Sequence, residues 1–268
     1  MSRIVYAPIN SSKKEPWPSR KALFGALAVF LFLIFAAGSV YALQLPEWQI
    51  RRLEISGLEV LGEEEIRVRI LSEISGNYAP FIPRSSFFLV RGKEINNTLV
   101  NEFPRIEIVS VDKKFPDTLS IQIKERKLWG IFCSVQNCAY IDKNGVLYEE
   151  APSSQGSLIL KIASDAESFS IPSKILDDLT VGKMEFLSLG LKEKLNLNVI
   201  GYQLFSKIPG EIRVTVSDGF KIYFNRDDDL ENAFKVIKTV LDEEIKEKRG
   251  RLEYIDARFG NKVFYKLR

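Results

Sequence analysis

An uninterrupted apolar segment of 22 residues, from Ala22 to Leu43, most restricts how this chain can fold. It contains no charged side chain, and as an α-helix rising about 1.5 Å per residue it would be about 33 Å long. That length crosses a hydrocarbon core of about 30 Å, so the segment predicts a transmembrane helix over residues 22–43. The alternative is a cleaved signal peptide ending near Ala42, but the apolar run is longer than the about 7–15 residues typical of a signal peptide's apolar h-region.

The charges beside this segment predict which way it crosses the membrane. Residues 1–21 hold five basic residues and one acidic residue, a net of +4; the whole chain is +3, so residues 22–268 sum to −1. A positive-inside bias puts this tail, which is expected to be disordered, in the cytoplasm and the remainder outside it, although Arg51 and Arg52 oppose that orientation slightly. The near-neutral outer part predicts no nucleic-acid partner.

Histidine is absent from the chain, and cysteine occurs twice, as Cys133 and Cys138. The lack of histidine excludes Ser-His-Asp and Cys-His catalysis and every His-bearing metal site, and two cysteines alone cannot close a structural zinc site. The two cysteines are either joined as a disulfide, in an oxidising compartment, or are free thiols. No Gly-rich phosphate loop is present, so we predict no catalytic, cofactor-binding or metal-binding residue.

Residues 48–126 show the pattern of one α+β module. The sequence predicts a strand within 48–57, a helix over 62–74 and a second helix over 86–103 that ends before Pro104. A hairpin over 101–126 follows, in which Leu119, Ile121 and Ile123 alternate with polar residues. The order strand, helix, helix, strand, strand (β-α-α-β-β) predicts a three-stranded sheet covered on one face by two helices.

This order resembles a POTRA domain, and FPRIEIVSVDKKFPDTLSIQIKER (103–126) is similar to that domain's closing hairpin in the FtsQ/DivIB family of bacterial cell-division proteins. A tail, one membrane span and a POTRA domain directly after it also match that family's layout. The resemblance implies a tail over 1–21, a span over 22–43, a POTRA domain over 48–126 and the family's β domain over 127–268. The expected fold class is therefore α+β, with a mixed, β-rich second domain that ends in a helix and a strand.

The pattern after residue 127 agrees with such a second domain. A hairpin with an Asn144-Gly145 turn is expected over 139–150, and a helix over 172–195 whose continuity Gly182 and Gly190 weaken. In EIRVTVSDGFKIYF (211–224) a three-residue loop pairs Val214 with Ile222 and puts the apolar residues on one face, whereas a two-residue turn does not. A helix over 228–249, capped by Asp228, precedes RLEYIDARFGNKVFYKLR (251–268), which is similar to the family's closing stretch.

The resemblance also implies what the chain does. The family acts as a non-catalytic, membrane-anchored scaffold of the divisome at the septum, joins two single-span proteins of the FtsL and FtsB types, and helps control septal wall synthesis. Its main partner surface is the final strand with the preceding helix, which corresponds here to 228–249 plus 254–265. The candidate contacts are Tyr254, Phe259, Val263, Phe264, Tyr265, Lys235 and Lys238. Alternation predicts that one of Phe264 and Tyr265 points inward.

Two other classes of function were weighed against this interpretation. POTRA modules also serve in outer-membrane assembly and secretion, but the chain has one such unit and no barrel-length tail. A membrane-anchored wall enzyme would need paired carboxylates, and Asp142, Asp218 and Asp256 are more simply turn or strand-end residues. Asp256 and Arg258 lie two apart on a strand and are expected to form a structural ion pair.

Overall fold

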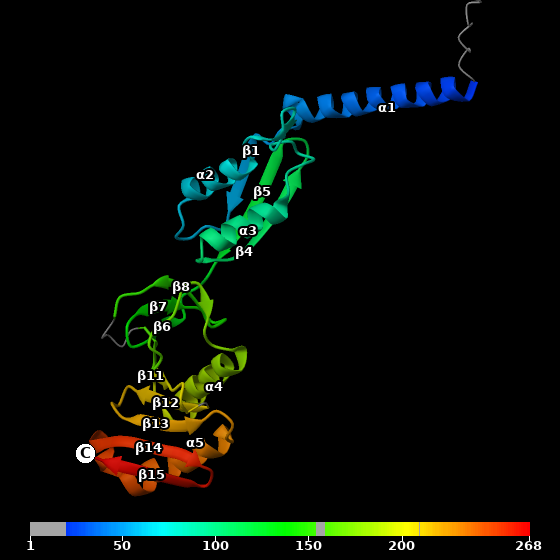
Figure 1. The fold of residues 1–268 in the computed structure, drawn as a ribbon. Helices are drawn as coiled ribbons and strands as arrows, with labels where there is room; N and C mark the ends of the chain where they lie inside the picture. Colours follow the sequence, from blue (N-terminus) through cyan, green and yellow to red (C-terminus); the bar gives the residue numbers. More distant parts are fainter. Residues whose placement is uncertain (1–19, 154–158, 209) are drawn as a thin grey trace, which may run out of the picture. The chain divides into compact units, whose positions relative to one another are not determined.

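The computed structural model describes residues 20–153, 159–208 and 210–268. Most of the predicted tail, residues 1–19, lies outside the described residues. The first element is helix α1 (Arg20–Gln44), which contains the predicted span and extends it slightly at both ends (Figure 1). Among the described residues, α1 is the one helix long and apolar enough to cross a membrane, with a mean hydropathy of 2.5 over Leu23–Gln44 and no buried share. It therefore fits a single-pass membrane anchor.

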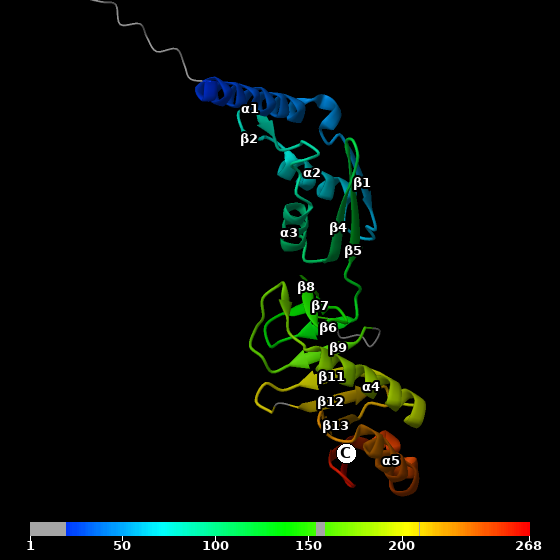
Figure 2. The ribbon, with the colours of Figure 1, turned by 90° about the vertical axis from the view of Figure 1, so that its right-hand side faces the viewer.

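A small α+β module follows α1 and the short 3₁₀ turn η1 (Pro46–Trp48). Its elements are β1 (Arg52–Ser56), α2 (Glu63–Ile74), α3 (Gly92–Glu102), β4 (Ile106–Lys114) and β5 (Thr118–Glu125). The sheet order is β1-β5-β4, and Figure 2 shows α2 and α3 on the same face of that sheet. The predicted order of elements and the predicted layering are both confirmed.

The core of this module comes from the spacings read in the sequence. Ile66, Ile70 and Ile74 of α2 are buried, as are Ile95 and Leu99 of α3. Strand β5 adds three further buried residues at alternate positions, Leu119, Ile121 and Ile123.

Two details of this module differ from the prediction. Residues 86–91 precede α3 rather than belonging to it, and a two-stranded hairpin, β2 (Asn77–Ala79) with β3 (Ile82–Pro83), lies between α2 and α3.

One buried carboxylate organises the loop that joins β1 to α2. Glu125, at the end of β5, accepts hydrogen bonds at Oε1 from the backbone N–H groups of Glu59 (2.8 Å), Val60 (3.0 Å) and Leu61 (3.0 Å). Burial opposes ionisation of this carboxyl group, but the three backbone donors outweigh it and hold the pKa of Glu125 below its usual 4.5. The charge of Glu125 thus satisfies three donors that the loop would otherwise leave unpaired.

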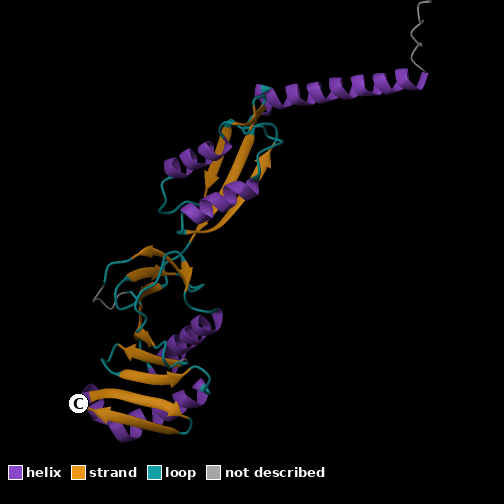
Figure 3. Cartoon of the chain, viewed as in Figure 1, coloured by secondary structure: helices purple, strands orange, loops and turns teal. Residues whose placement is uncertain are grey.

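The second part of the chain is built on one mixed sheet in the order β10-β8-β7-β6-β9-β11-β12-β13-β14-β15 (Figure 3). Its strands are β6 (Gly130–Cys133), β7 (Cys138–Ile141), β8 (Val146–Glu150), β9 (Lys161–Ser164), β10 (Ser173–Lys174), β11 (Val199–Leu204), β12 (Glu211–Val216), β13 (Lys221–Asn225), β14 (Leu252–Phe259) and β15 (Lys262–Leu267). The β7–β8 hairpin turns at Asn144-Gly145 as predicted. Strands β12 and β13 pair Val214 with Ile222 and Ile212 with Phe224, which confirms the register derived from the sequence.

Two helices cover one face of this sheet (Figure 2). Helix α4 (Asp178–Leu195) begins six residues after the predicted start at 172 and is continuous through Gly182 and Gly190. Gly190 is needed for packing, because a Cβ atom there would overlap the ring of Phe234 on helix α5 (Leu230–Thr239), whereas a Cβ at Gly182 would meet open space.

The last helix differs from the prediction at both ends. Its cap is Asp229, whose side chain accepts from the N–H of Asn232, rather than Asp228. After Thr239 the helical path continues as a π segment, η2 (Val240–Ile245), and a 3₁₀ segment, η3 (Lys246–Arg251), instead of a regular α-helix to residue 249. Leu241 and Ile245 remain buried along this path, so the apolar face persists while the winding changes. The segment carries the chain from β13 to β14, which run parallel.

We predict opposite effects of alanine at the two glycines of α4. Gly190→Ala should lower the free energy of unfolding by about 1–3 kcal/mol, because the new methyl group must displace Phe234. Gly182→Ala should raise it by about 0.5–1 kcal/mol, because the position is helical and open. Thermal unfolding of the full chain in detergent would measure both. Equal stability of the two variants would contradict the close approach of α4 to α5.

We also predict that Glu125 makes stability depend on acid pH. Because its folded-state pKa is lowered, its contribution is fully present above the usual value near 4.5 and is lost as the pH falls through the folded-state pKa. Glu125→Gln should cost about 1–3 kcal/mol at neutral pH and should flatten the dependence of unfolding on pH below about 5. Glu59→Gln is the matched control, since Glu59 is an exposed residue of the same loop. If both variants keep the wild-type acid dependence, Glu125 is not the group responsible.

Candidate partner-binding site

Strand β15 lies at one end of the ten-stranded sheet and pairs only with β14 among the described strands (Figure 1). The N–H of Arg268, just past β15, donates to the carbonyl of Arg251. Backbone direction alternates along a strand, so the N–H groups of Lys266 and Phe264 also face β14, while those of Tyr265 and Val263 face outward. The sheet therefore ends in a row of outward backbone donors and acceptors.

The predicted aromatic residues gather at this edge. Phe259 is 54 % exposed, Phe264 55 % and Tyr265 41 %, and the rings of Phe259 and Phe264 meet edge to face at 5.3 Å. Val263 is half-buried against the core. Alternation does turn one of the two side chains toward the core face, but neither Phe264 nor Tyr265 is buried. Tyr265 shares a face with Val263, yet at the outermost strand no further strand covers its ring.

The segment treated in the sequence as a single final strand is in fact a hairpin. β14 ends at Phe259 and β15 begins at Lys262, and Asn261 in the turn accepts a 2.8 Å hydrogen bond from Asn232 in the first turn of α5. Tyr254 belongs to the inner strand β14, where its ring stacks on Tyr223 of β13 at 5.0 Å. Tyr254 thus supports the edge from within the sheet.

Helix α5 contributes two of the predicted contacts, Lys235 and Lys238. Both are exposed, whereas Phe234 and Ile237 of the same helix are buried. The ammonium group of Lys238 lies 3.2 Å from a carboxylate oxygen of Asp242. The structure therefore brings the two lysines and the aromatic edge into the same terminal part of the fold, since α5 packs against both β14 and β15.

A network of charged side chains holds β14 in place on the sheet face away from the helices. Arg258 donates through Nε to Oδ1 of Asp256 at 2.8 Å and through Nη2 to Oδ2 at 2.5 Å. These two contacts confirm the predicted ion pair. Arg258 also donates to Glu211 of β12, reaching across β13. Glu211 in turn binds Arg213 at 2.6 Å. These carboxylates raise the pKa of Arg258 above its ordinary value, with the hydrogen bonds to Asp256 as the leading cause.

Sequence reasoning missed the wider part of this network. Arg213 lies 4.5 Å from the ring centre of Tyr223, and Glu211 has only 2 % of its side chain exposed. The predicted register could have indicated part of this network, because the register that pairs Val214 with Ile222 also pairs Arg213 with Tyr223. Next to this network, Ile208, Glu211, Asn225, Arg258 and Phe259 line a hollow of about 250 Å³.

The other carboxylates considered as candidates occupy turns. Asp142 accepts from the N–H groups of Asn144 and Val146, both at 2.9 Å, and Asp218 lies in the exposed β12–β13 turn. Among the described residues no group of three or more Cys, Asp or Glu side chains is placed to hold a metal ion.

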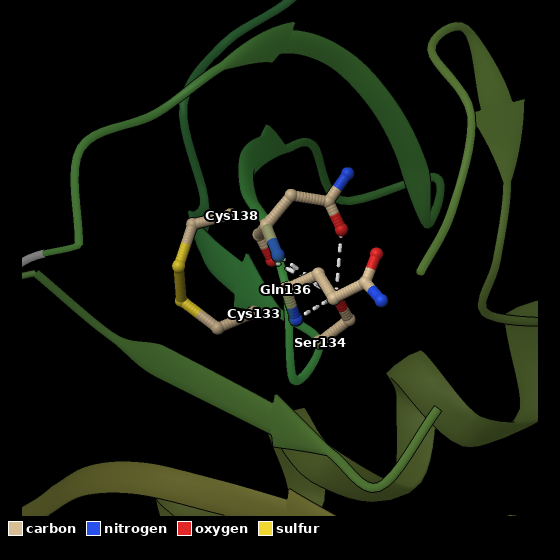
Figure 4. The surroundings of a disulfide bond; sticks show 5 residues. Cys133, Ser134, Gln136 and Cys138 are labelled. Carbon is tan, nitrogen blue, oxygen red and sulfur yellow. Dashed lines mark hydrogen bonds between the residues drawn. A yellow bond between two sulfur atoms is a disulfide. The ribbon is translucent and has the colours of Figure 1, made fainter. Parts of the chain in front are cut away.

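The two cysteines, whose state the sequence left open, are joined as a disulfide between β6 and β7. They face each other across the strand pair, and Ser134 organises the turn between them (Figure 4). Its Oγ accepts from the N–H groups of Gln136 (3.2 Å) and Asn137 (3.1 Å) and donates to Asn137 Oδ1 at 2.6 Å. The bridge therefore closes a hairpin that its own turn already shapes.

Comparison with known proteins agrees with this architecture. A family model described as "POTRA domain, FtsQ-type" matches residues 49–126. A "Cell division protein DivIB" of Clostridium botulinum strain Loch Maree is 26 % identical over 253 residues, covering 92 % of each chain. A second, from strain Hall, is 26 % identical over 254 residues with the same coverage. A third, from Clostridium acetobutylicum, is 28 % identical over 120 residues, 45 % of this chain and 44 % of the relative.

An apolar helix that fits a membrane anchor, a POTRA domain and a large mixed sheet together define a class: POTRA proteins with, among the residues described here, one candidate membrane span. Within that class the POTRA module is of the FtsQ type, and the chain is similar along 92 % of its length to cell division proteins named DivIB. The chain therefore resembles the FtsQ/DivIB family.

We predict that Arg258 stabilises the terminal hairpin. Arg258→Met should lower the free energy of unfolding by about 2 kcal/mol or more, because it leaves Asp256 and Glu211 with less compensation for their burial. Lys266→Met is the control: its pair with Glu253 is exposed, so its loss should change the free energy of unfolding much less than the loss of Arg258. Thermal unfolding of the full chain would measure both.

A double variant tests the pairing itself. Asp256→Asn combined with Arg258→Met should cost less than the sum of the single changes, since the two residues act on each other. Simple additivity would mean that the 2.8 Å and 2.5 Å contacts contribute little.

Proposed function

We propose that this protein is a non-catalytic, membrane-anchored scaffold of the bacterial divisome, and that β15 with α5 is its main docking surface. The observation that carries the proposal is the outward row of backbone groups on β15, flanked by exposed Phe259, Phe264 and Tyr265. An open edge of this kind accepts a further strand from another chain by β-augmentation. The relatives' description as cell division proteins supports the divisome as the setting.

The proposed partners are single-span division proteins of the FtsL and FtsB types. One of them would add a strand to β15, bury the aromatic rings of the edge, and place acidic side chains near Lys235 and Lys238. Through this complex the protein would help control septal wall synthesis by other divisome members. The absence of histidine from the sequence and the turn positions of Asp142 and Asp218 support a non-catalytic role.

The proposal includes a topology and a domain division. The basic tail over 1–21 would lie in the cytoplasm, α1 would span the cytoplasmic membrane, and the POTRA domain (48–126) and the β domain (127–268) would lie outside the cytoplasm, at the septum. The +4 charge of the tail supports this orientation. The disulfide agrees with an oxidising compartment.

Proline and alanine at Tyr265 separate the backbone contribution of the edge from that of the ring. Both changes remove the aromatic side chain, but only Tyr265→Pro also removes an outward N–H, and an edge strand tolerates proline at such a position. Tyr265→Pro should weaken capture of the FtsL- and FtsB-type proteins about tenfold more than Tyr265→Ala, because a lost hydrogen bond and the steric block of the ring together cost about 1–2 kcal/mol. Co-purification from membranes, with titrated partner, is the measurement.

Equal binding by the two variants would contradict docking by strand addition.

The position of an N-terminal fluorescent fusion tests the wider proposal independently. Wild-type protein should form a band at the septum, and an even membrane outline from a functional fusion would contradict the divisome role while leaving the anchor intact.

A further inference from the structure

Aromatic side chains gather immediately after the end of α1. Trp48 and Phe88 meet edge to face at 5.4 Å, Phe88 meets Phe87 at 5.6 Å, and Phe87 meets Phe115 at 5.6 Å. Phe88 is 51 % exposed and Phe115 67 %. Together with Phe81 of the β2–β3 turn, these rings form what we call the aromatic rim: Trp48, Phe81, Phe87, Phe88 and Phe115. A cluster of aromatic rings that stays exposed to solvent indicates an interaction surface.

Backbone contacts fix the rim to the chain that leaves α1. The N–H of Phe87 donates to the carbonyl of Trp48 at 2.7 Å, and the N–H of Ile50 donates to the carbonyl of Ser85 at 2.8 Å. The ammonium group of Lys113 donates to the Phe87 carbonyl at 2.9 Å and lies 5.2 Å from the centre of its ring. The rings therefore keep their places relative to Trp48, four residues after α1 ends at Gln44.

A side-chain contact ties the most exposed ring to the end of the helix itself. Gln44, the last residue of α1, donates through Nε2 to the backbone carbonyl of Phe81 at 3.0 Å. Gln44 also accepts, at its own carbonyl, a 3.1 Å hydrogen bond from the side chain of Gln49. Phe81 is 69 % exposed. In both views the β4–β5 turn lies next to this end of α1 (Figures 1 and 2), and strand β3 packs against α1.

We propose that the aromatic rim is a membrane-docking surface, which inserts into the boundary between headgroups and acyl chains on the side where α1 leaves the bilayer. If α1 spans the membrane, Gln44 lies at that boundary, and the hydrogen bond to Phe81 places the β2–β3 turn at the same depth. Aromatic rings are favoured there because their apolar bodies leave water while polar neighbours stay hydrated. The inference rests on the proposed span and goes beyond the proposed scaffold role.

The charges around the rim identify apolar insertion as the main attraction. Residues 45–54, 71–91 and 112–120 contain six basic and five acidic side chains, so the region is almost neutral. A site built for anionic headgroups would carry a clear basic excess. Docking should therefore occur on zwitterionic phosphatidylcholine as well as on vesicles that contain phosphatidylglycerol. A protein partner is less consistent with Phe81, because a carbonyl bonded to the end of a span is already within the lipid boundary.

A spin label at Phe81 measures its depth directly. The chain has two cysteines, both in the disulfide, so Phe81→Cys introduces the only free thiol for a nitroxide label. The full-length variant is reconstituted at low density into phosphatidylcholine vesicles. Collision of the label with oxygen, which concentrates in lipid, is compared with collision with a water-soluble nickel chelate. Leu189→Cys is the matched control, since Leu189 on α4 is a 58 % exposed apolar residue outside the rim.

We expect the ratio of oxygen to nickel collisions at Phe81 to exceed that at Leu189 about threefold or more, corresponding to a depth of about 5–10 Å. Phe88→Cys should give an intermediate ratio. A Phe81 label as accessible to nickel as the Leu189 label would overturn the proposal. Phe30→Cys, in the middle of α1, separates the two possible failures. If Phe30 lies in lipid and Phe81 in water, the span holds and the rim does not dock; if Phe30 is also in water, the span itself is wrong.

Discussion

The guanidinium group of Arg258 is the contact on which the exposed edge of this protein depends. It binds Asp256 on its own strand and Glu211 two strands away, and both carboxylates are almost withdrawn from water. Each of these charges would be costly alone, so the complete network stabilises the hairpin β14–β15 in its place. Tyr223 and Tyr254 stack beside it and fill the same face. An edge strand offered to a partner needs such support, because it has a neighbour on one side only.

On the opposite face of the sheet, the packing of helices α4 and α5 depends on one close contact. The two helices share one core, and Gly190 allows the ring of Phe234 to lie directly on the α4 backbone. The π and 3₁₀ turns after α5 keep Leu241 and Ile245 buried while the chain bends toward β14. The parallel pairing of β13 with β14 follows from this crossover, since parallel neighbours require the chain to return across a face of the sheet. The exposed edge at β15 is thus a consequence of helix packing as well as of strand pairing.

The proposed membrane attachment and the proposed partner docking would depend on different physical interactions. Around α1 the exposed groups are an apolar helix and aromatic rings, which favour a lipid solvent over a particular partner. At β15 the exposed groups are directional backbone donors and acceptors, which would select a strand of suitable register. The proposed scaffold role needs no catalytic residue, because a scaffold acts by positioning the proteins that it holds.

The sequence by itself determined the anchor helix, the order of elements in the POTRA module and the register of β12 on β13. Each of these follows from local periodicity: an uncharged apolar run, isoleucines at helical spacing, and alternation that only one loop length satisfies. It also found the pair of Asp256 with Arg258, because the two residues share a strand.

Only the tertiary structure decided the rest. The true cap at Asp229, the reach of Arg258 to Glu211, the continuity of α4 through Gly190 and the exposure of both Phe264 and Tyr265 depend on residues far apart in the chain. Periodicity assigns a side chain to a face of a strand, but it does not say whether another element covers that face. The burial of a side chain depends on which other elements pack against it, and those contacts form only when the sheet and its helices pack together.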